Sequence, residues 1–336
     1  MKMDRDDWLA YTTEETFEPE LAICDPHHHF WDRPTHRYVL DELRADIESG
    51  HNVVSTVFIE CRASYREDGP EAFKPIGETE FVHAIAEAAA ADPAVGARVA
   101  AGIVGLADLT LGDDVAAVLE AQIAASPMRF RGIRHAAGFD DSDDVRNSHT
   151  NPTKYLLAEP KFRAGFAQLA PLNMSFEGWL YHRQIPELTD LARAFPETTI
   201  ILNHFGGPLG IGPYAGRRQE ILDQWRRDIT ELAACENVVA KLGGLFMPIN
   251  GFGFHERERP PSSAELAEAG RPYHIHAIEQ FGVDRCMFES NFPVDRASTS
   301  YNVLWNTFKR LAEGFSGTEK AALFHDTAAR VYRLDT

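Results

Sequence analysis

The amino-acid sequence predicts an α/β fold, a single (β/α)8 TIM barrel. Three observations predict it: short apolar runs rich in β-branched residues alternate with segments of helical periodicity, eight such runs can be counted, and 336 residues suit one barrel. Alternating strands and helices imply parallel pairing through right-handed crossovers, and eight units are the number that closes a barrel. We expect a polar N-terminal extension over residues 1–20 and one barrel domain over residues 21–336.

The apolar runs are the predicted strands, in chain order. They are Leu21–Asp25, Val53–Glu60, Arg98–Val104, Phe130–His135, Asn173–Glu177, Thr199–His204, Val238–Leu242 and Cys286–Asn291. The predicted helices repeat apolar residues at intervals of three and four. They are Glu78–Ala91, Asp113–Ala125, Pro160–Leu169, Ile185–Phe195, Gln219–Cys235, Tyr273–Phe281 and Tyr301–Ala312. Pro186 in the first turn of its helix and Pro196 after its end stand where a missing N–H costs least.

Two stretches rich in glycine and proline, Phe205–Gly216 and Gly243–Gly270, are predicted to be loops. The first follows a strand directly, and loops at the carboxyl ends of strands build the active sites of barrels. A connection as long as the second is usually a lid or a binding loop. We therefore expect the functional site at this end of the barrel.

Composition excludes several classes of partner. The formal net charge of −18 repels phosphate backbones and anionic lipids, so we expect neither nucleic acid nor a membrane as partner. No apolar run approaches the roughly 20 residues that span a bilayer, and residues 1–20 lack the apolar segment of a signal peptide. We expect a cytoplasmic protein whose partner is a small-molecule substrate. The sequence leaves the oligomeric state open, and a homo-oligomer is one possibility.

Histidines crowd the end of the first predicted strand. Side chains alternate along a strand, so Asp25, His27 and His29 share one face. If that face is the interior of the barrel, two imidazoles converge at the top of the strand, and neutral imidazole is a common ligand of divalent metals. Loop histidines without a chemical role are the alternative that this pattern leaves open.

Two later strand ends carry similar groups. His204 ends an apolar strand just before a run of glycines, and its coincidence with the first-strand histidines favours a functional role. On the last strand Glu289 and Asn291 share a face and should point inward. A buried glutamate is costly unless it is paired or functional. A catalytic acid or base and a structural hydrogen-bonding partner both remain open for Glu289, because burial raises the pKa of a carboxyl.

Further residues are candidates for the pocket wall. Arg134 could hold a substrate carboxylate in a bidentate grip, with a salt bridge as the alternative. Lys241 could face the pocket, with a solvated lysine as the alternative. Trp31 and Trp179 follow strands and could line the pocket, although ordinary packing is the more frequent role of such aromatic residues. Weaker candidates are Glu60, Glu177, His135 and His182.

Five motifs together resemble the amidohydrolase superfamily, in the branch called amidohydrolase 2 or predicted metal-dependent TIM-barrel hydrolases, and the resemblance spans nearly the whole chain. They are Asp25-Pro26-His27-His28-His29-Phe30-Trp31, Arg131-Gly132-Ile133-Arg134, Asn203-His204-Phe205-Gly206-Gly207-Pro208, Lys241-Leu242-Gly243-Gly244-Leu245 and the segment Phe324–Tyr332. The resemblance implies that His27, His29 and His204 are metal ligands or polarise the substrate. The implied cofactor is a divalent metal such as Zn²⁺, although some relatives act without one.

The chain departs from the family pattern at the last strand. The family usually shows G-S-D-W-P-V, in which the aspartate is a metal ligand and the general base, whereas this chain has Glu289-Ser290-Asn291-Phe292-Pro293-Val294. An amide cannot take a proton and is a weaker ligand than a carboxylate. Our hypothesis is that Glu289 acts as the base, directly or through a water held by Asn291.

The leading functional hypothesis is therefore a lactonase-like hydrolase of a small carboxylated lactone, ester or amide. His27, His29, His204, Glu289 and Asn291 are its expected catalytic residues. A decarboxylase on the same barrel is the second hypothesis. A small-molecule binder without activity is the third, because a fold alone does not establish catalysis.

Overall fold

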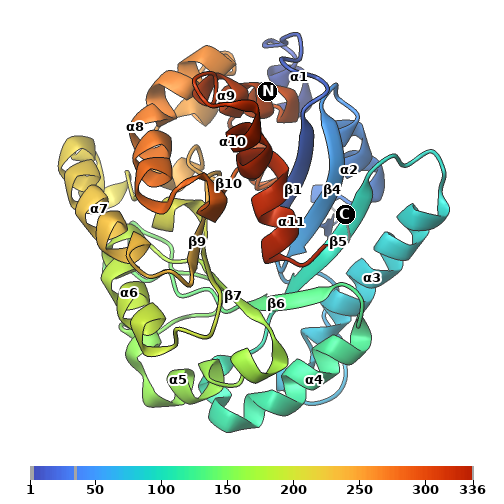
Figure 1. Ribbon diagram of the computed structural model, residues 1–336, viewed down its shortest axis with the longest axis vertical. Coiled ribbons are helices and arrows are strands. Elements are labelled where there is room, and N and C mark those ends of the chain that lie inside the picture. Colours follow the sequence, from blue (N-terminus) through green and yellow to red (C-terminus); the bar gives the residue numbers. More distant parts are fainter. Residues whose placement is uncertain (1–3, 34–35, 335–336) are drawn as a thin grey trace.

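The computed structural model describes residues 4–33 and 36–334, and its centre is one sheet of eight parallel strands (Figure 1). Neighbouring strands pair in chain order without a crossover inside the sheet. The strands are β1 (Ala22–His28), β4 (Asn52–Ile59), β5 (Arg98–Gly105), β6 (Phe130–Arg134), β7 (Ser175–Gly178), β8 (Ile200–Leu202), β9 (Val238–Lys241) and β10 (Cys286–Met287). All eight lie within or beside the predicted runs, and the TIM barrel is confirmed.

The barrel closes through the chain that follows β10. The backbone N–H of Asn291 donates to the carbonyl of His27 at 2.8 Å, and the N–H of His29 donates to the carbonyl of Phe292 at 2.8 Å. The strand predicted over Cys286–Asn291 is therefore shorter than expected. Cys286 and Met287 pair with β9, whereas Asn291 hydrogen-bonds to the end of β1. This junction places Glu289 beside the histidines of β1.

Helices surround the sheet, and α10 and α11 lie across the opening of the barrel in Figure 1. They are α1 (Arg5–Leu9), α2 (Leu40–Ile47), α3 (Ile76–Ala91), α4 (Val115–Ala125), α5 (Pro160–Phe166), α6 (Ile185–Ala194), α7 (Arg218–Ala233), α8 (Ser263–Phe281), α9 (Tyr301–Leu311), α10 (Gly317–Ala321) and α11 (Thr327–Val331). Each predicted helix corresponds to one of α3 to α9. In the described part of the chain, no helix is both long and apolar enough to cross a membrane.

The predicted loop Gly243–Gly270 is wrong over its last eight residues, because α8 already begins at Ser263. The Ser262 hydroxyl accepts the N–H of Glu265 at 3.3 Å, and the Glu265 carboxylate accepts the N–H of Ser262 at 2.9 Å. Such a reciprocal cap satisfies two donors that the first turn of a helix leaves free. Gly270 and Pro272 concealed this start, since both residues disfavour the interior of a helix.

Several short elements have no counterpart among the predictions: α1, α2, α10, α11 and a hairpin of β2 (Trp31–Arg33) and β3 (His36–Tyr38). The N-terminal residues lie against the barrel. The Trp8 indole N–H donates to the carbonyl of Arg257 at 2.9 Å, and the N–H of Ser263 donates to Glu14 at 2.8 Å. Trp8 and Glu14 therefore contact the start of α8 and the chain just before it, while the boundary of a separate extension over residues 1–20 stays a prediction.

The interior of the barrel is filled from the strands and from the C-terminal segment. One buried cluster joins Cys24, Ile201 and Met287 of the strands to Tyr332 and Leu334. A second and larger cluster lies between the sheet and the outer helices. The C-terminal segment thus seals one end of the barrel and leaves the other end for the site.

Candidate active site

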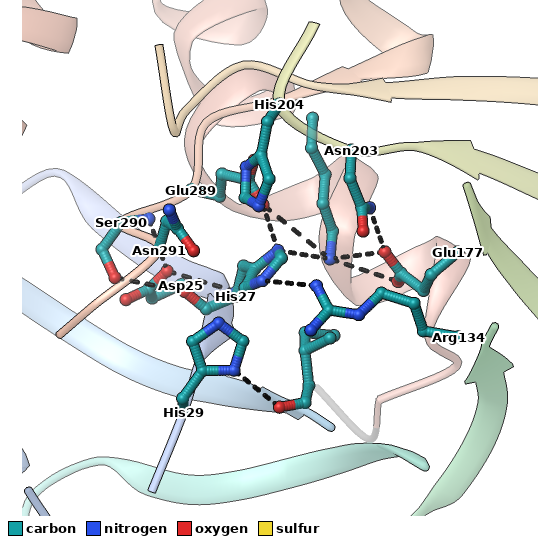
Figure 2. A network of polar contacts seen from close by, with 12 residues as sticks. Asp25, His27, His29, Arg134, Glu177, Asn203, His204, Glu289, Ser290 and Asn291 are labelled. Atoms are coloured by element: carbon teal, nitrogen blue, oxygen red, sulfur yellow. Dashed lines mark hydrogen bonds and ion pairs between the residues drawn. The ribbon is translucent and has the colours of Figure 1, made fainter. Parts of the chain in front are cut away.

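Three buried side chains from three different strand ends meet in the barrel: His27, His204 and Glu289 (Figure 2). Nδ1 of His27 lies 2.6 Å from Oε2 of Glu289, and Nδ1 of His204 lies 2.7 Å from Oε1. Burial raises the pKa of Glu289 to about 8. Burial, together with nearby cations, lowers the pKa of both histidines well below the usual value. The two imidazoles are therefore neutral at physiological pH.

This donor set fits a divalent metal. The ligand atoms of His27, His204 and Glu289 all lie within 4.8 Å of one another. Two neutral imidazoles and one carboxylate are a set of ligands that Zn²⁺ takes in enzymes. The set differs from the one expected from the sequence, since Glu289 belongs to it and His29 does not.

His29 has a different environment from the other two site histidines. Its Nδ1 lies 2.8 Å from the carbonyl of Ile59, so this nitrogen carries the proton and donates it. Its ring centre lies 4.9 Å from that of His27 and 6.3 Å from that of Trp31, with the Trp31 ring stacked parallel to it. His29 thus stands beside the three-residue group, and its catalytic role stays a prediction.

Two cations flank His27, and each has its own carboxylate. Nζ of Lys241 lies 2.9 Å from Glu177 and 3.4 Å from Nδ1 of His27. Nη1 of Arg134 lies 3.4 Å from Nε2 of His27, and its Nε donates to Glu60 at 2.7 Å. Lys241 is fully buried rather than solvated. A bidentate grip of Arg134 on a substrate carboxylate would have to replace contacts that it already makes within the protein.

Glu177 is the centre of a further buried network. Besides Lys241, its carboxylate accepts hydrogen bonds from the hydroxyl of Tyr332 and the amide of Asn203. The C-terminal segment is thereby connected to the cation beside His27. Sequence reasoning named Glu177 only as a weak candidate, because its partners come from distant parts of the chain.

Asn291 and Asp25 hold the junction between β1 and the chain after β10. The Asn291 amide donates to Asp295 at 2.6 Å, and burial raises the pKa of Asp295 to about 8. Asp25 accepts the N–H of Ser290 at 2.9 Å and the hydroxyl of Tyr301 at 2.9 Å. The amide nitrogen of Asn291 is therefore committed to Asp295, and the role of Asn291 toward a water stays a prediction.

The two glycines after β9 make room for the site. A Cβ added to Gly243 would lie 2.4 Å from Cγ of Glu289, and one added to Gly244 would lie 2.3 Å from Nδ1 of His204. Gly244 also has a φ of +69°, which favours glycine. The Lys241-Leu242-Gly243-Gly244 motif of the sequence thus packs directly against the His204 and Glu289 pair.

A cavity of about 910 Å³ lies next to this group; its walls include Trp179, His149, Tyr181, Met247, Val294 and His255. Trp179 joins the cavity to the site, because its ring lies 5.0 Å from that of His204. Trp31 lines a separate neighbouring cavity of about 520 Å³. His135 and His182 accept backbone N–H groups at 3.2 and 3.3 Å, which are structural contacts.

Sequence reasoning missed His149 as a pocket residue. It lies on the connection from β6 to α5, and its Nε2 is 3.2 Å from Oε2 of Glu60. No strand ends near it in the sequence, so the alternation of strand side chains gave no signal. A search for titratable residues in the long connections after strands would have included it.

Comparison with known proteins agrees with this fold. The sequence matches the amidohydrolase family over residues 24–334. It is 34% identical to the uncharacterized protein y4mH of Sinorhizobium fredii, over 94% of this chain and 99% of that protein. It is 28% identical to the L-fucono-1,5-lactonase of Burkholderia multivorans, over 61% of this chain and 64% of that enzyme.

Solved structures of known proteins share the fold of this chain. An amidohydrolase of Burkholderia multivorans with bound zinc has a TM-score of 0.71 and 25% identity, covering 94% of this chain and all of that one (100%). A putative 2-pyrone-4,6-dicarboxylic acid hydrolase of Pseudomonas putida has a TM-score of 0.62 at 16% identity, covering 94% and 99%, and shows the same fold. The chain belongs to the amidohydrolase family and is a hydrolase built on a TIM barrel.

Proposed function

We propose that this hydrolase opens small lactones by adding water to the ring carbonyl. The observation that carries the proposal is the contact of 2.7 Å between Nδ1 of His204 and Glu289, next to a cavity large enough for a small molecule. The similarity to L-fucono-1,5-lactonases supports it. Because Arg134 and Lys241 are already paired with buried glutamates, the proposal requires no carboxylate on the substrate.

The proton of the attacking water goes to His204. Glu289 is fully buried, so water reaches an imidazole more readily than this carboxylate. With its Nδ1 proton donated to Glu289, His204 keeps a lone pair on Nε2 that can accept a proton. Glu289 then stabilises the imidazolium of His204, as the aspartate of a catalytic triad stabilises its histidine. The sequence predicted Glu289 as the general base. In this proposal His204 accepts the proton from water, and Glu289 acts through His204.

Positive charge near His27 suits the second requirement of ester hydrolysis. The carbonyl oxygen becomes an oxyanion when water adds to the carbon, and fixed donors stabilise this charge. Arg134 is 6% exposed and approaches His27 within 3.4 Å. We assign to Arg134 the stabilisation of this charge, with Glu60 fixing its guanidinium.

The three-residue group also suits a metal-assisted version. His27, His204 and Glu289 would hold a divalent ion such as Zn²⁺, which when bound polarises a carbonyl and lowers the pKa of water. The zinc found in the related amidohydrolase of Burkholderia multivorans supports this version.

A panel of sugar lactones and simple δ-lactones tests the proposal. Hydrolysis releases one proton per ring opened, which a pH indicator records without a coupled enzyme. We expect turnover of at least one lactone and loss of most of it in His204→Asn. Turnover of none of the lactones, with the protein folded and supplied with Zn²⁺, would contradict lactone hydrolysis.

A further inference from the structure

His149 is a second titratable group on the wall of the same cavity. Its side chain is 22% exposed, whereas the Glu60 carboxylate behind it is fully buried. Nε2 of His149 lies 3.2 Å from Oε2 of Glu60. The imidazole therefore has one nitrogen beside a buried carboxylate while the ring remains open to the cavity.

The Glu60 carboxylate is held as an anion. Burial would raise its pKa, but Arg134 and His149 outweigh this effect and lower it to about 2. Arg134 takes the other oxygen of Glu60 at 2.7 Å and reaches His27 with Nη1. Figure 2 shows the Arg134 side chain directed toward His27. Glu60 therefore places a buried negative charge 3.2 Å from Nε2 of His149.

Lactone hydrolysis needs such a donor. After water adds to the carbonyl, the bond between the carbonyl carbon and the ring oxygen breaks, and its electron pair goes to the ring oxygen. An alkoxide is a poor leaving group unless it is protonated as it leaves. The His204 and Glu289 pair takes a proton from water and could return it to the leaving oxygen, as the histidine of a catalytic triad does. A second donor on the cavity wall would protonate that oxygen without this return step.

The other ionisable side chains of the cavity wall suit the task less well. His255 lies 3.6 Å from Glu256 at the surface and contacts no buried carboxylate in the described residues. The Tyr181 hydroxyl is committed to the carbonyl of Arg146. Arg146 and Asp144, which also line the cavity, are exposed to solvent and contact no buried carboxylate in the described residues.

Resting on the proposed lactone hydrolysis, we infer that His149 is the general acid that protonates the leaving ring oxygen. Glu60 holds Nε2, and Nδ1 gives its proton to the ring oxygen as the carbon to oxygen bond breaks. The products are one hydroxy acid, a protonated His204 and a neutral His149. His204 releases its proton to solvent, and His149 regains one from solvent through the open cavity.

The test compares two lactones whose leaving groups differ. δ-Valerolactone releases an alkoxide, whereas a nitro-substituted dihydrocoumarin releases a phenoxide that needs no proton. In His149→Gln we expect kcat/KM to fall by about 100-fold or more for δ-valerolactone, the usual contribution of a general acid, and to change little for the dihydrocoumarin. The ratio of the two values is independent of the fraction of folded protein.

His255→Gln is the matched control, since His255 lines the same cavity without the contact to a buried glutamate. Any effect of this change should be equal for the two lactones. An equal loss for both lactones in His149→Gln, or no loss, would overturn the role of His149 while wild-type turnover upholds lactone hydrolysis. Absence of turnover in the wild type would overturn both proposals together.

Discussion

Oε1 of Glu289 lies 2.7 Å from Nδ1 of His204, and neither residue is more than 3% exposed. The two come from strand ends 85 residues apart. Burial raises the pKa of Glu289 and lowers that of His204 well below its usual value, so burial favours the neutral form of each residue. This pair is the centre of the proposed chemistry.

Gly244→Ala should damage the site more than the fold. The new Cβ would lie 2.3 Å from Nδ1 of His204, and alanine at a φ of +69° adds strain of about 1–3 kcal/mol. We expect kcat to fall at least tenfold. Gly216→Ala is the control, because its φ is +75° but a Cβ there has no neighbour within 4 Å. Equal kcat values for the two variants would contradict the steric argument.

The metal ligands can be identified by counting bound metal. Protein loaded with Zn²⁺ and desalted should retain about one equivalent, and His27→Ala or Glu289→Gln should lose it. His29→Ala should retain it, since Nδ1 of His29 is committed to the carbonyl of Ile59. Elemental analysis of the four proteins gives the result. Metal lost in His29→Ala but kept in Glu289→Gln would instead support the ligand set expected from the sequence.

The buried ion pair of Lys241 and Glu177 predicts strong coupling between the two residues. Lys241→Met leaves the Glu177 carboxylate without its cation, and such a change costs about 3–5 kcal/mol of unfolding free energy. Lys241→Met with Glu177→Gln removes both charges and should recover most of this loss. Urea unfolding measures all three proteins. If the double variant is no more stable than the single one, the pair does not carry the stability assigned to it.

Glu78 predicts how stability depends on pH. It is fully buried and accepts the N–H groups of Cys61 and Ala63 at 2.9 and 2.7 Å. Burial, and then the charge of Glu60, raise its pKa from 4.5 to about 8. A raised folded-state pKa gives stability that is complete below 4.5 and is lost as the pH rises through about 8.

Glu78→Gln should therefore melt at a temperature that varies less between pH 5 and pH 9 than that of the wild type. Asp295 and Glu289 also have pKa values raised to about 8, so the variant still loses stability through these two groups, and only the difference between the two proteins reports on Glu78. The melting temperature at a series of pH values measures it. Parallel curves for wild type and variant would contradict the assigned pKa of Glu78.

The fold could be predicted from the sequence because strand and helix periodicity is local. Short apolar runs located the eight strands, and the ends of those strands located His27 and His204. The start of α8 was not predicted, because the low helix propensity of Gly270 and Pro272 outweighs the capping signal at Ser262.

The contacts of the site could not be predicted in the same way. Alternation shows which way Glu289 points, but not that its two oxygens meet two different histidines. The pairing of Lys241 with Glu177 joins β9 to β7, and His149 lies on a long connection whose path periodicity does not describe. Such contacts depend on how the barrel closes, which is a property of the whole chain.

The most direct test of the proposed chemistry is kcat/KM of Glu289→Gln on a lactone that the wild type hydrolyses. Glutamine keeps the shape but cannot stabilise an imidazolium at His204, so we expect a fall of about 100- to 10,000-fold. Glu78→Gln is the matched control, since it neutralises another fully buried glutamate, whose hydrogen bonds in the described residues come from the backbone N–H groups of Cys61 and Ala63 and from the Cys61 thiol. The result predicted is a large loss in Glu289→Gln with the activity of Glu78→Gln unchanged. Wild-type activity in Glu289→Gln would contradict the central role of the His204 and Glu289 pair.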